Sequence, residues 1–102
     1  MLKFFKSLFG KDNQELVRAF ENGAVIVDVR TAAEFSQGHI PGSKNIPLNE
    51  LKLKSDLIRK WNKPVITVCR SGNRSGIAKG ILKATGIDAY NGGAWTNLKT
   101  SQ

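Results

Sequence analysis

Residues 64–75 of this 102-residue chain read PVITVCRSGNRS, and this stretch decides the fold. The run 65–68 is short, apolar and rich in β-branched residues, which is typical of a buried strand. Gly72 gives the following segment access to backbone angles that other residues avoid, and a helix is expected to begin near Ser75. The pattern predicts a strand, a tight loop and a helix, with Cys69 where the strand ends.

Strands of the same kind are predicted elsewhere in the chain. Residues 24–29 are apolar except for Asp28 and follow Gly23. Residues 44–46 form a short run ending at Pro47, and residues 87–90 supply the last strand. These strands alternate with helical patterns, which is typical of a parallel sheet covered on both faces. The expected fold class is therefore α/β, with three layers: a central parallel sheet and helices on each side.

Four main helical segments lie between and around these strands. The first begins at a capping box of Asp12 and Glu15, and the second runs from a Thr31 cap through Phe35. Asn49 is expected to cap the third, and Gly86 to end the fourth. The residues expected to face inward are Leu16, Val17, Ala19 and Phe20 in the first helix. In the third helix they are Leu53, Leu57, Ile58 and Trp61, and in the fourth they are Ile77, Ala78, Ile81, Leu82 and Thr85. Residues 92–95 are expected to turn into a short C-terminal helix.

The loop after Cys69 is the candidate functional site. Ligands of α/β sheets lie beyond the carboxyl ends of the strands. A curled loop leading into a helix turns its backbone N–H groups inward, which makes a site for an anion. These donors, the helix dipole, Arg70 and Arg74 favour a thiolate over a thiol. The alternative is that Cys69 is an inert buried residue, but the two arginines, the glycine and the helix start favour a functional thiol.

The charge of the chain is unevenly distributed. Residues 44–83 carry ten Lys or Arg against Glu50 and Asp56, which is the whole net charge of +8. A positive field around Cys69 favours a small anionic substrate or an acidic protein partner. Nucleic acid is the rival interpretation, but no nucleic-acid motif supports it. A single cysteine excludes an internal disulfide and an all-cysteine metal site, and we expect neither metal nor cofactor.

The first residues leave two interpretations open. Leu2, Phe5 and Phe9 would line one helical face beside lysines, as in a membrane-surface anchor. Packing of this short segment onto the domain is the favoured interpretation. No run is long enough to span a bilayer, and the start is too interrupted for a signal peptide. We expect a soluble, cytoplasmic monomer.

Three motifs, in order, resemble the rhodanese family. The first motif comprises residues 27–30, Glu34 and Phe35, residues 38–42 and residues 45–47. The second is the loop Cys69–Ser75, and the third comprises residues 90–93 with Trp95. The resemblance implies a rhodanese-like domain over residues 12–102. Residues 1–11 are then an extension, in which Ser7–Phe9 would supply a first strand if they do not form a surface helix.

The resemblance also implies a chemistry. Cys69 would take a sulfane sulfur from a donor such as thiosulfate, hold it as a persulfide and pass it to an acceptor. The cradle would be Arg70, Ser71, Gly72, Asn73, Arg74 and Ser75, and the two arginine side chains would help to bind the donor. Asp28 and Arg30 would support the site, and His39 is expected to tie the loop backbone together rather than act as a base.

Two alternatives to a sulfurtransferase remain. One is a binding or regulatory module with this shape and no chemistry, although such members usually lack the cysteine. The other is a cysteine-based phosphatase or arsenate reductase. Those phosphatases place five residues between cysteine and arginine, whereas four separate Cys69 from Arg74, and the smaller loop suits a single sulfur atom.

Overall fold

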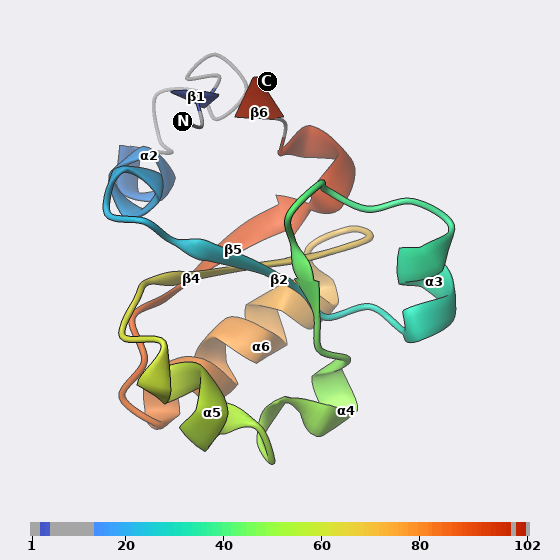
Figure 1. Ribbon diagram of the computed structural model, residues 1–102. Helices are drawn as coiled ribbons and strands as arrows, with labels where there is room; N and C mark the ends of the chain where they lie inside the picture. The colour runs from blue at the N-terminus through green and yellow to red at the C-terminus, as the bar shows by residue number, and fades with distance from the viewer. Residues whose placement is uncertain (1–2, 5–13, 99, 102) are drawn as a thin grey trace.

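A four-stranded parallel sheet forms the centre of the molecule (Figure 1). The computed structural model describes residues 3–4, 14–98 and 100–101. The sheet has the order β3-β2-β4-β5, and its strands are β2 (Val25–Asp28), β3 (Lys44–Asn45), β4 (Val65–Cys69) and β5 (Ala89–Ala94). A separate antiparallel pair joins β1 (Lys3–Phe4) to β6 (Thr100–Ser101). The predicted parallel sheet is confirmed.

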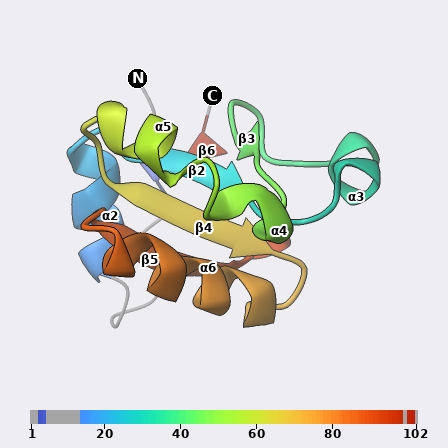
Figure 2. The same ribbon diagram turned by 90° about the horizontal axis from the view of Figure 1, so that it is seen from below.

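Helices cover both faces of this sheet (Figures 1 and 2). The helix α2 (Gln14–Glu21) lies on one face, and α4 (Leu48–Leu51), α5 (Ser55–Lys60) and α6 (Asn73–Ala84) lie on the other. The short helices α3 (Ala32–Ser36) and η2 (Trp95–Asn97) follow the ends of β2 and β5. The three predicted layers are therefore present.

Alternation along β4 assigns its side chains to the two layers. Ile66 and Val68 pack in the cluster that contains α2, whereas Val65 and Cys69 pack in the cluster that contains α6. All five residues of β4 are buried, as expected for the central part of a parallel sheet. Cys69 thus ends a rigid strand and faces the helix that follows it in sequence.

The prediction for residues 49–61 was right that Ile58 and Trp61 face the core and wrong about Leu53 and Leu57. The chain forms two short helices, α4 and α5, separated by a turn, and Pro47 rather than Asn49 caps the first. Leu53 and Leu57 are exposed, and the buried positions are Leu51, Ser55 and Ile58. The Ser55 hydroxyl donates to the Lys52 carbonyl at 2.9 Å, so this polar residue is satisfied where an apolar one was expected.

Two further predictions fail towards the C-terminus. Ile77 points to solvent, because the buried face of α6 is Ser75, Ala78 and Leu82. The segment 92–94 was expected to turn, but β5 continues to Ala94 through an irregularity in its pairing with β4. The β5 strand reaches far enough for Ala94 to pair with Cys69.

Some predictions concern residues that the structure does not describe. These are the Asp12 half of the first capping box and a strand at Ser7–Phe9. Of the surface helix or anchor expected at residues 1–9, the structure describes Lys3–Phe4, and these two residues form the strand β1. Among the described residues, no helix has the length and apolar character required to cross a membrane.

Gly92 and Gly80 make a matched pair for testing the packing. A Cβ on Gly92 would lie 2.7 Å from Ile66 Cγ2 and 2.8 Å from Leu98 Cδ1, whereas one on Gly80 in α6 would meet nothing within 4 Å. Overpacking predicts that Gly92→Ala lowers the free energy of unfolding by about 1–3 kcal/mol. Gly80→Ala is expected to raise it by up to about 1 kcal/mol through helix propensity. Urea unfolding measures whether each substitution raises or lowers the free energy of unfolding. An unchanged free energy of unfolding in Gly92→Ala would contradict the packing described.

Candidate active site

The turn from β4 into α6 surrounds the sulfur of Cys69 with hydrogen-bond donors. Gly72 has φ of 102°, in the left-handed region, and serves as the N-cap of α6. This conformation lets the Gly72 N–H donate to Cys69 Sγ at 3.0 Å, and the Ser75 N–H donates to it at 3.3 Å. The expected cradle of inward-facing amides is thus formed by Gly72 and Ser75, with Sγ at its base.

A partly buried polar network supports this cradle. The Ser75 hydroxyl lies 3.3 Å from Cys69 Sγ and 2.6 Å from Asn91 Oδ1. Asn91 Oδ1 also accepts from the Gly93 N–H, and its Nδ2 donates to the Gly72 carbonyl. The Thr67 hydroxyl donates to the Ser75 carbonyl at 2.8 Å. Strands β4 and β5 therefore hold Ser75 and Gly72 in place from below.

These contacts change the acidity of Cys69. Burial raises the pKa of this thiol, but its side-chain contact with the Ser75 hydroxyl and the hydrogen bonds from the amides of Ser75, Gly72 and Ser71 outweigh it. Together they hold the pKa of Cys69 below its ordinary value. The side chain is almost fully buried, with 1% of the residue exposed. The site can stabilise an anionic sulfur.

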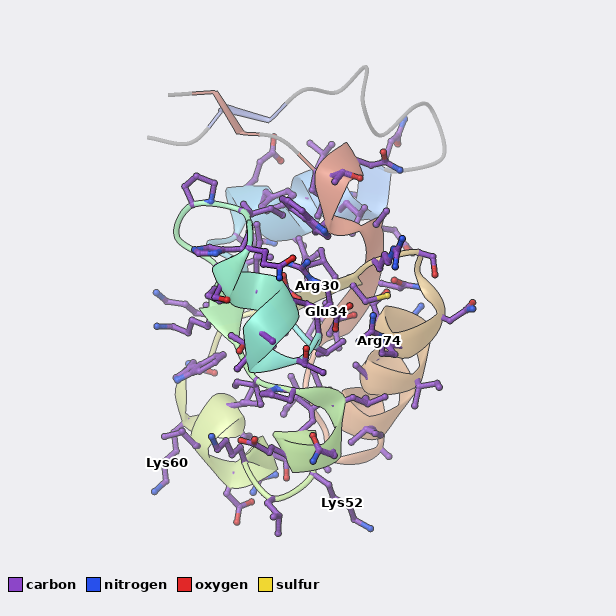
Figure 3. All side chains as sticks on the ribbon, turned by 90° about the vertical axis from the view of Figure 1, so that its right-hand side faces the viewer. Arg30, Glu34, Lys52, Lys60 and Arg74 are labelled. Carbon is purple, nitrogen blue, oxygen red and sulfur yellow. The ribbon has the colours of Figure 1, made fainter. Side chains whose placement is uncertain are left out.

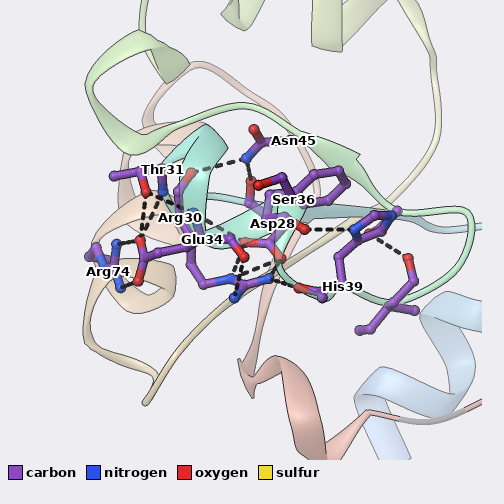
Figure 4. A network of polar contacts seen from close by, with 12 residues as sticks. Asp28, Arg30, Thr31, Glu34, Ser36, His39, Asn45 and Arg74 are labelled. Carbon is purple, nitrogen blue, oxygen red and sulfur yellow. Dashed lines mark hydrogen bonds and ion pairs between the residues drawn. The ribbon is translucent and has the colours of Figure 1, made fainter.

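Asp28 and Arg30 form a buried ion pair beside the loop (Figure 4). Arg30 Nη2 lies 2.7 Å from Asp28 Oδ2, and Nε lies 2.9 Å from Oδ1. Arg30 also donates to the carbonyls of Gly38 and Glu34 and lies over the Trp95 ring, 4.6 Å from its centroid. The Arg30 guanidinium therefore links the end of β2 to α3, to the loop at Gly38 and to Trp95.

Arg74 is bound by a carboxylate from α3. Its Nη1 and Nη2 donate to Glu34 Oε1 and Oε2 at 2.7 and 3.0 Å (Figures 3 and 4). The Arg74 side chain also lines a cavity of about 310 Å³ with Val29, Thr31, Pro47, Leu48 and Asn49. Arg70, Ser71 and Asn73 are exposed on the outer side of the loop. Of the two arginines expected to bind a donor, Arg70 alone presents a guanidinium without a partner among the described residues.

His39 lies on the opposite side of the Asp28–Arg30 pair from Arg74 (Figure 4). Its Nδ1 is 2.8 Å from the Phe35 carbonyl, and its ring stacks on that of Phe35 with centroids 3.7 Å apart. The contacts of His39 are thus with α3 and the loop after it. They fit a role in holding that loop.

Two residues of the site were not assigned a role from the sequence. Asn91 and Glu34 both stood in motifs, but neither was expected to contact the cradle or Arg74. Asn91 could have been noticed as a polar residue near the end of a strand that neighbours β4. Nothing local to Glu34 indicates its partner, since Arg74 is forty residues away.

Comparisons with known proteins agree with this geometry. The sequence model of the "Rhodanese-like domain" family matches residues 12–97. The uncharacterized protein YqhL of Bacillus subtilis is 42% identical over 79 residues, covering 76% of this chain and 62% of that protein. The thiosulfate sulfurtransferase GlpE of Pseudomonas savastanoi pv. phaseolicola is 40% identical over 73 residues, covering 69% of this chain and 66% of that protein. The chain thus spans less than two thirds of the length of either relative.

A solved structure shares the fold. A structure titled "rhodanese with anions from E. coli" superposes with a TM-score of 0.68 at 30% sequence identity. The superposition covers 78% of this chain and 99% of that one. The similarity therefore extends over a whole domain of that kind.

The Ser75 hydroxyl provides a test of the cradle. Ser75→Ala removes the largest of the contacts that lower the pKa of Cys69, so the pKa of that thiol should rise. The rate of alkylation by iodoacetamide, followed against pH, should shift to higher pH. Ser71→Ala is the matched control, because Ser71 acts through its backbone amide, which the substitution keeps. Equal alkylation profiles against pH for Ser75→Ala and the unchanged protein would show that the Ser75 hydroxyl does not lower the pKa of Cys69.

Proposed function

The chain belongs to the rhodanese-like domain family, and from this premise we propose that it is a sulfurtransferase whose sulfur carrier is Cys69. The observation that supports this proposal most strongly is the group of amides around Sγ, which favours the thiolate over the thiol. A persulfide carries its negative charge on the outer sulfur, so the same loop would stabilise the loaded form.

The reaction needs no cofactor. The Cys69 thiolate attacks the sulfane sulfur of a donor such as thiosulfate, and a new S–S bond forms to Sγ. The S–S bond of the donor breaks, and its electron pair leaves on sulfite. A nucleophilic acceptor then attacks the outer sulfur of the persulfide, and the Cys69 thiolate leaves. Each step moves one sulfur and one electron pair, so no oxidant is required.

No general base is required in this scheme. The donors around Sγ hold the pKa of the thiol below its ordinary value and so favour the thiolate without a neighbouring base. His39 contacts Phe35, and the Asp28–Arg30 pair is satisfied internally. We assign these three residues to supporting the loop, and assign donor binding to Arg70 together with the amides.

The charge of the surface fits a protein partner in addition to a small donor. Lys52 and Lys60 are exposed on the layer of α4 and α5, away from Arg30, Glu34 and Arg74 (Figure 3). An acidic protein that supplies or accepts the sulfur would be attracted to this layer. A carrier with one reactive thiol and no resolving partner suits the reducing cytoplasm.

Replacing the nucleophile tests the function directly. Incubation with thiosulfate and cyanide should yield thiocyanate, and Cys69→Ser should abolish it because no sulfur can be held. Mass spectrometry of the unchanged protein should show Cys69 gaining the mass of one sulfur atom after exposure to thiosulfate. If no donor, thiosulfate or persulfide, loads sulfur on Cys69, the sulfurtransferase proposal is wrong.

The assigned role of Arg70 gives a second expected result. Arg70→Gln should raise the KM for thiosulfate up to roughly fivefold, the scale of one exposed charge interaction. The value of kcat should change little, because the amides around Sγ remain. Lys52→Gln, which removes an equal charge from the residue that follows α4, serves as the control. Equal KM values in the two variants would show that Arg70 takes no part in binding the donor.

A further inference from the structure

The ion pair between Glu34 and Arg74 joins two sides of the active site. Glu34 belongs to α3, and Arg74 belongs to the first turn of α6, next to the Ser75 amide that donates to Cys69 Sγ. Both carboxylate oxygens are used, at 2.7 and 3.0 Å, and both side chains are about one third exposed. This bidentate geometry is the strong form of the contact.

Glu34 is fixed independently of Arg74. Its Oε1 accepts from the Thr31 N–H at 3.0 Å and from the Thr31 hydroxyl at 3.1 Å, and the Glu34 N–H donates back to that hydroxyl (Figure 4). This capping box keeps the carboxylate in place at the start of α3. Chiefly through Arg74, and also through Thr31, the pKa of Glu34 is lowered to about 2, so the group is charged at any working pH.

The consequence concerns the charge that an incoming donor meets. Arg74 would otherwise be a free cation in the first turn of α6, next to Ser75, whose amide donates to Cys69 Sγ. Glu34 cancels this charge at the place where it would act. Among the described residues, the loop is left with Arg70 as its free guanidinium, and Arg70 is exposed to solvent.

We propose that Glu34 is a specificity residue that shifts the site towards singly charged sulfur donors by cancelling the charge of Arg74. The inference rests on the proposed sulfur transfer and adds the class of donor. A doubly charged donor such as thiosulfate gains more from a second free guanidinium than a singly charged persulfide or thiosulfonate does. Glu34 therefore lowers the preference of the site for thiosulfate over singly charged donors. Glu34 acts through Arg74 and does not touch the reacting sulfur.

Two donors differ in charge but share their chemistry. Thiosulfate carries two negative charges, and the methanethiosulfonate anion carries one, with a methyl group in place of an oxygen. In both, the Cys69 thiolate bonds to the sulfane sulfur while the donor S–S bond breaks. The electron pair leaves on sulfite in the first case and on methanesulfinate in the second. The ratio of kcat/KM for the two donors thus reports how the site responds to one added charge.

The test measures this ratio in Glu34→Gln, which keeps the shape of the side chain and removes its charge. The ratio of thiosulfate to methanethiosulfonate should rise roughly fivefold, as expected for one freed charge acting on one extra donor charge near a protein surface. The gain should appear mainly in the KM for thiosulfate and should shrink at high ionic strength. A ratio that stays unchanged or falls overturns the proposal.

Three variants separate specificity from structure. Glu34→Asp keeps the charge and should keep the ratio. A purely structural role of Glu34 would instead lower kcat/KM equally for both donors in both Glu34 variants. Arg74→Gln leaves Glu34 uncompensated and should move the ratio in the opposite direction, which provides a test if Glu34→Gln folds poorly. Asp56→Asn removes a carboxylate from the Asp56–Arg59 pair on α5 and should leave the ratio unchanged.

A second readout does not depend on sulfur transfer. Freeing Arg74 places a cation near Cys69, so in Glu34→Gln the alkylation of this thiol by neutral iodoacetamide should shift to lower pH. If neither donor loads sulfur on the unchanged protein, the proposed function fails while this shift still tests the charge of Arg74. If sulfur transfer is normal and neither the ratio nor the alkylation profile responds, the role of Glu34 fails alone.

Discussion

The contact on which the site depends is the pair of N–H groups, from Gly72 and Ser75, that donate to one sulfur atom. It exists because β4 ends at Cys69 and α6 begins four residues later, so the backbone must curl with its amides inward. The positive φ of Gly72 makes this curl accessible at little cost. The end of β4, Gly72 and the start of α6 thus place several partial positive charges around the Cys69 thiol. These charges favour its anionic form more than water does.

The rest of the molecule keeps this turn in register. From β5, Asn91 holds both the Ser75 hydroxyl and the Gly72 carbonyl, so the sheet fixes the loop from below. From α3, Glu34 holds Arg74, while the Glu34 carbonyl receives a hydrogen bond from Arg30. The buried Asp28–Arg30 pair is therefore connected to the first turn of α6 through one short helix. Sulfur chemistry at Cys69 would depend on this support.

Local patterns were sufficient for most of the architecture. The β-branched runs predicted β2 and β4, and Thr31 with Glu34 makes a capping box at the residue expected to begin a helix. The cradle was also predictable, because a glycine-containing turn from a strand into a helix has few alternative shapes. Each of these features is decided within a few residues of sequence.

What the sequence did not reveal depends on contacts between distant segments. Leu53 and Leu57 are as apolar as Leu51, and only the turn between α4 and α5 decides which of them is buried. Gly92 and Gly93 are usual in turns, yet here Gly92 stays in β5 because Ile66 and Leu98 leave no space for a side chain. The Glu34–Arg74 pair joins residues forty apart, so no local pattern indicated that Arg74, which was expected to help bind the donor, has a carboxylate partner. The measurement that tests the account most directly is a titration of the Cys69 thiolate by its ultraviolet absorbance, with Cys69→Ser subtracted. The account predicts a midpoint clearly below the value of about 8.5 for an ordinary thiol, and a midpoint at or above that value would contradict it.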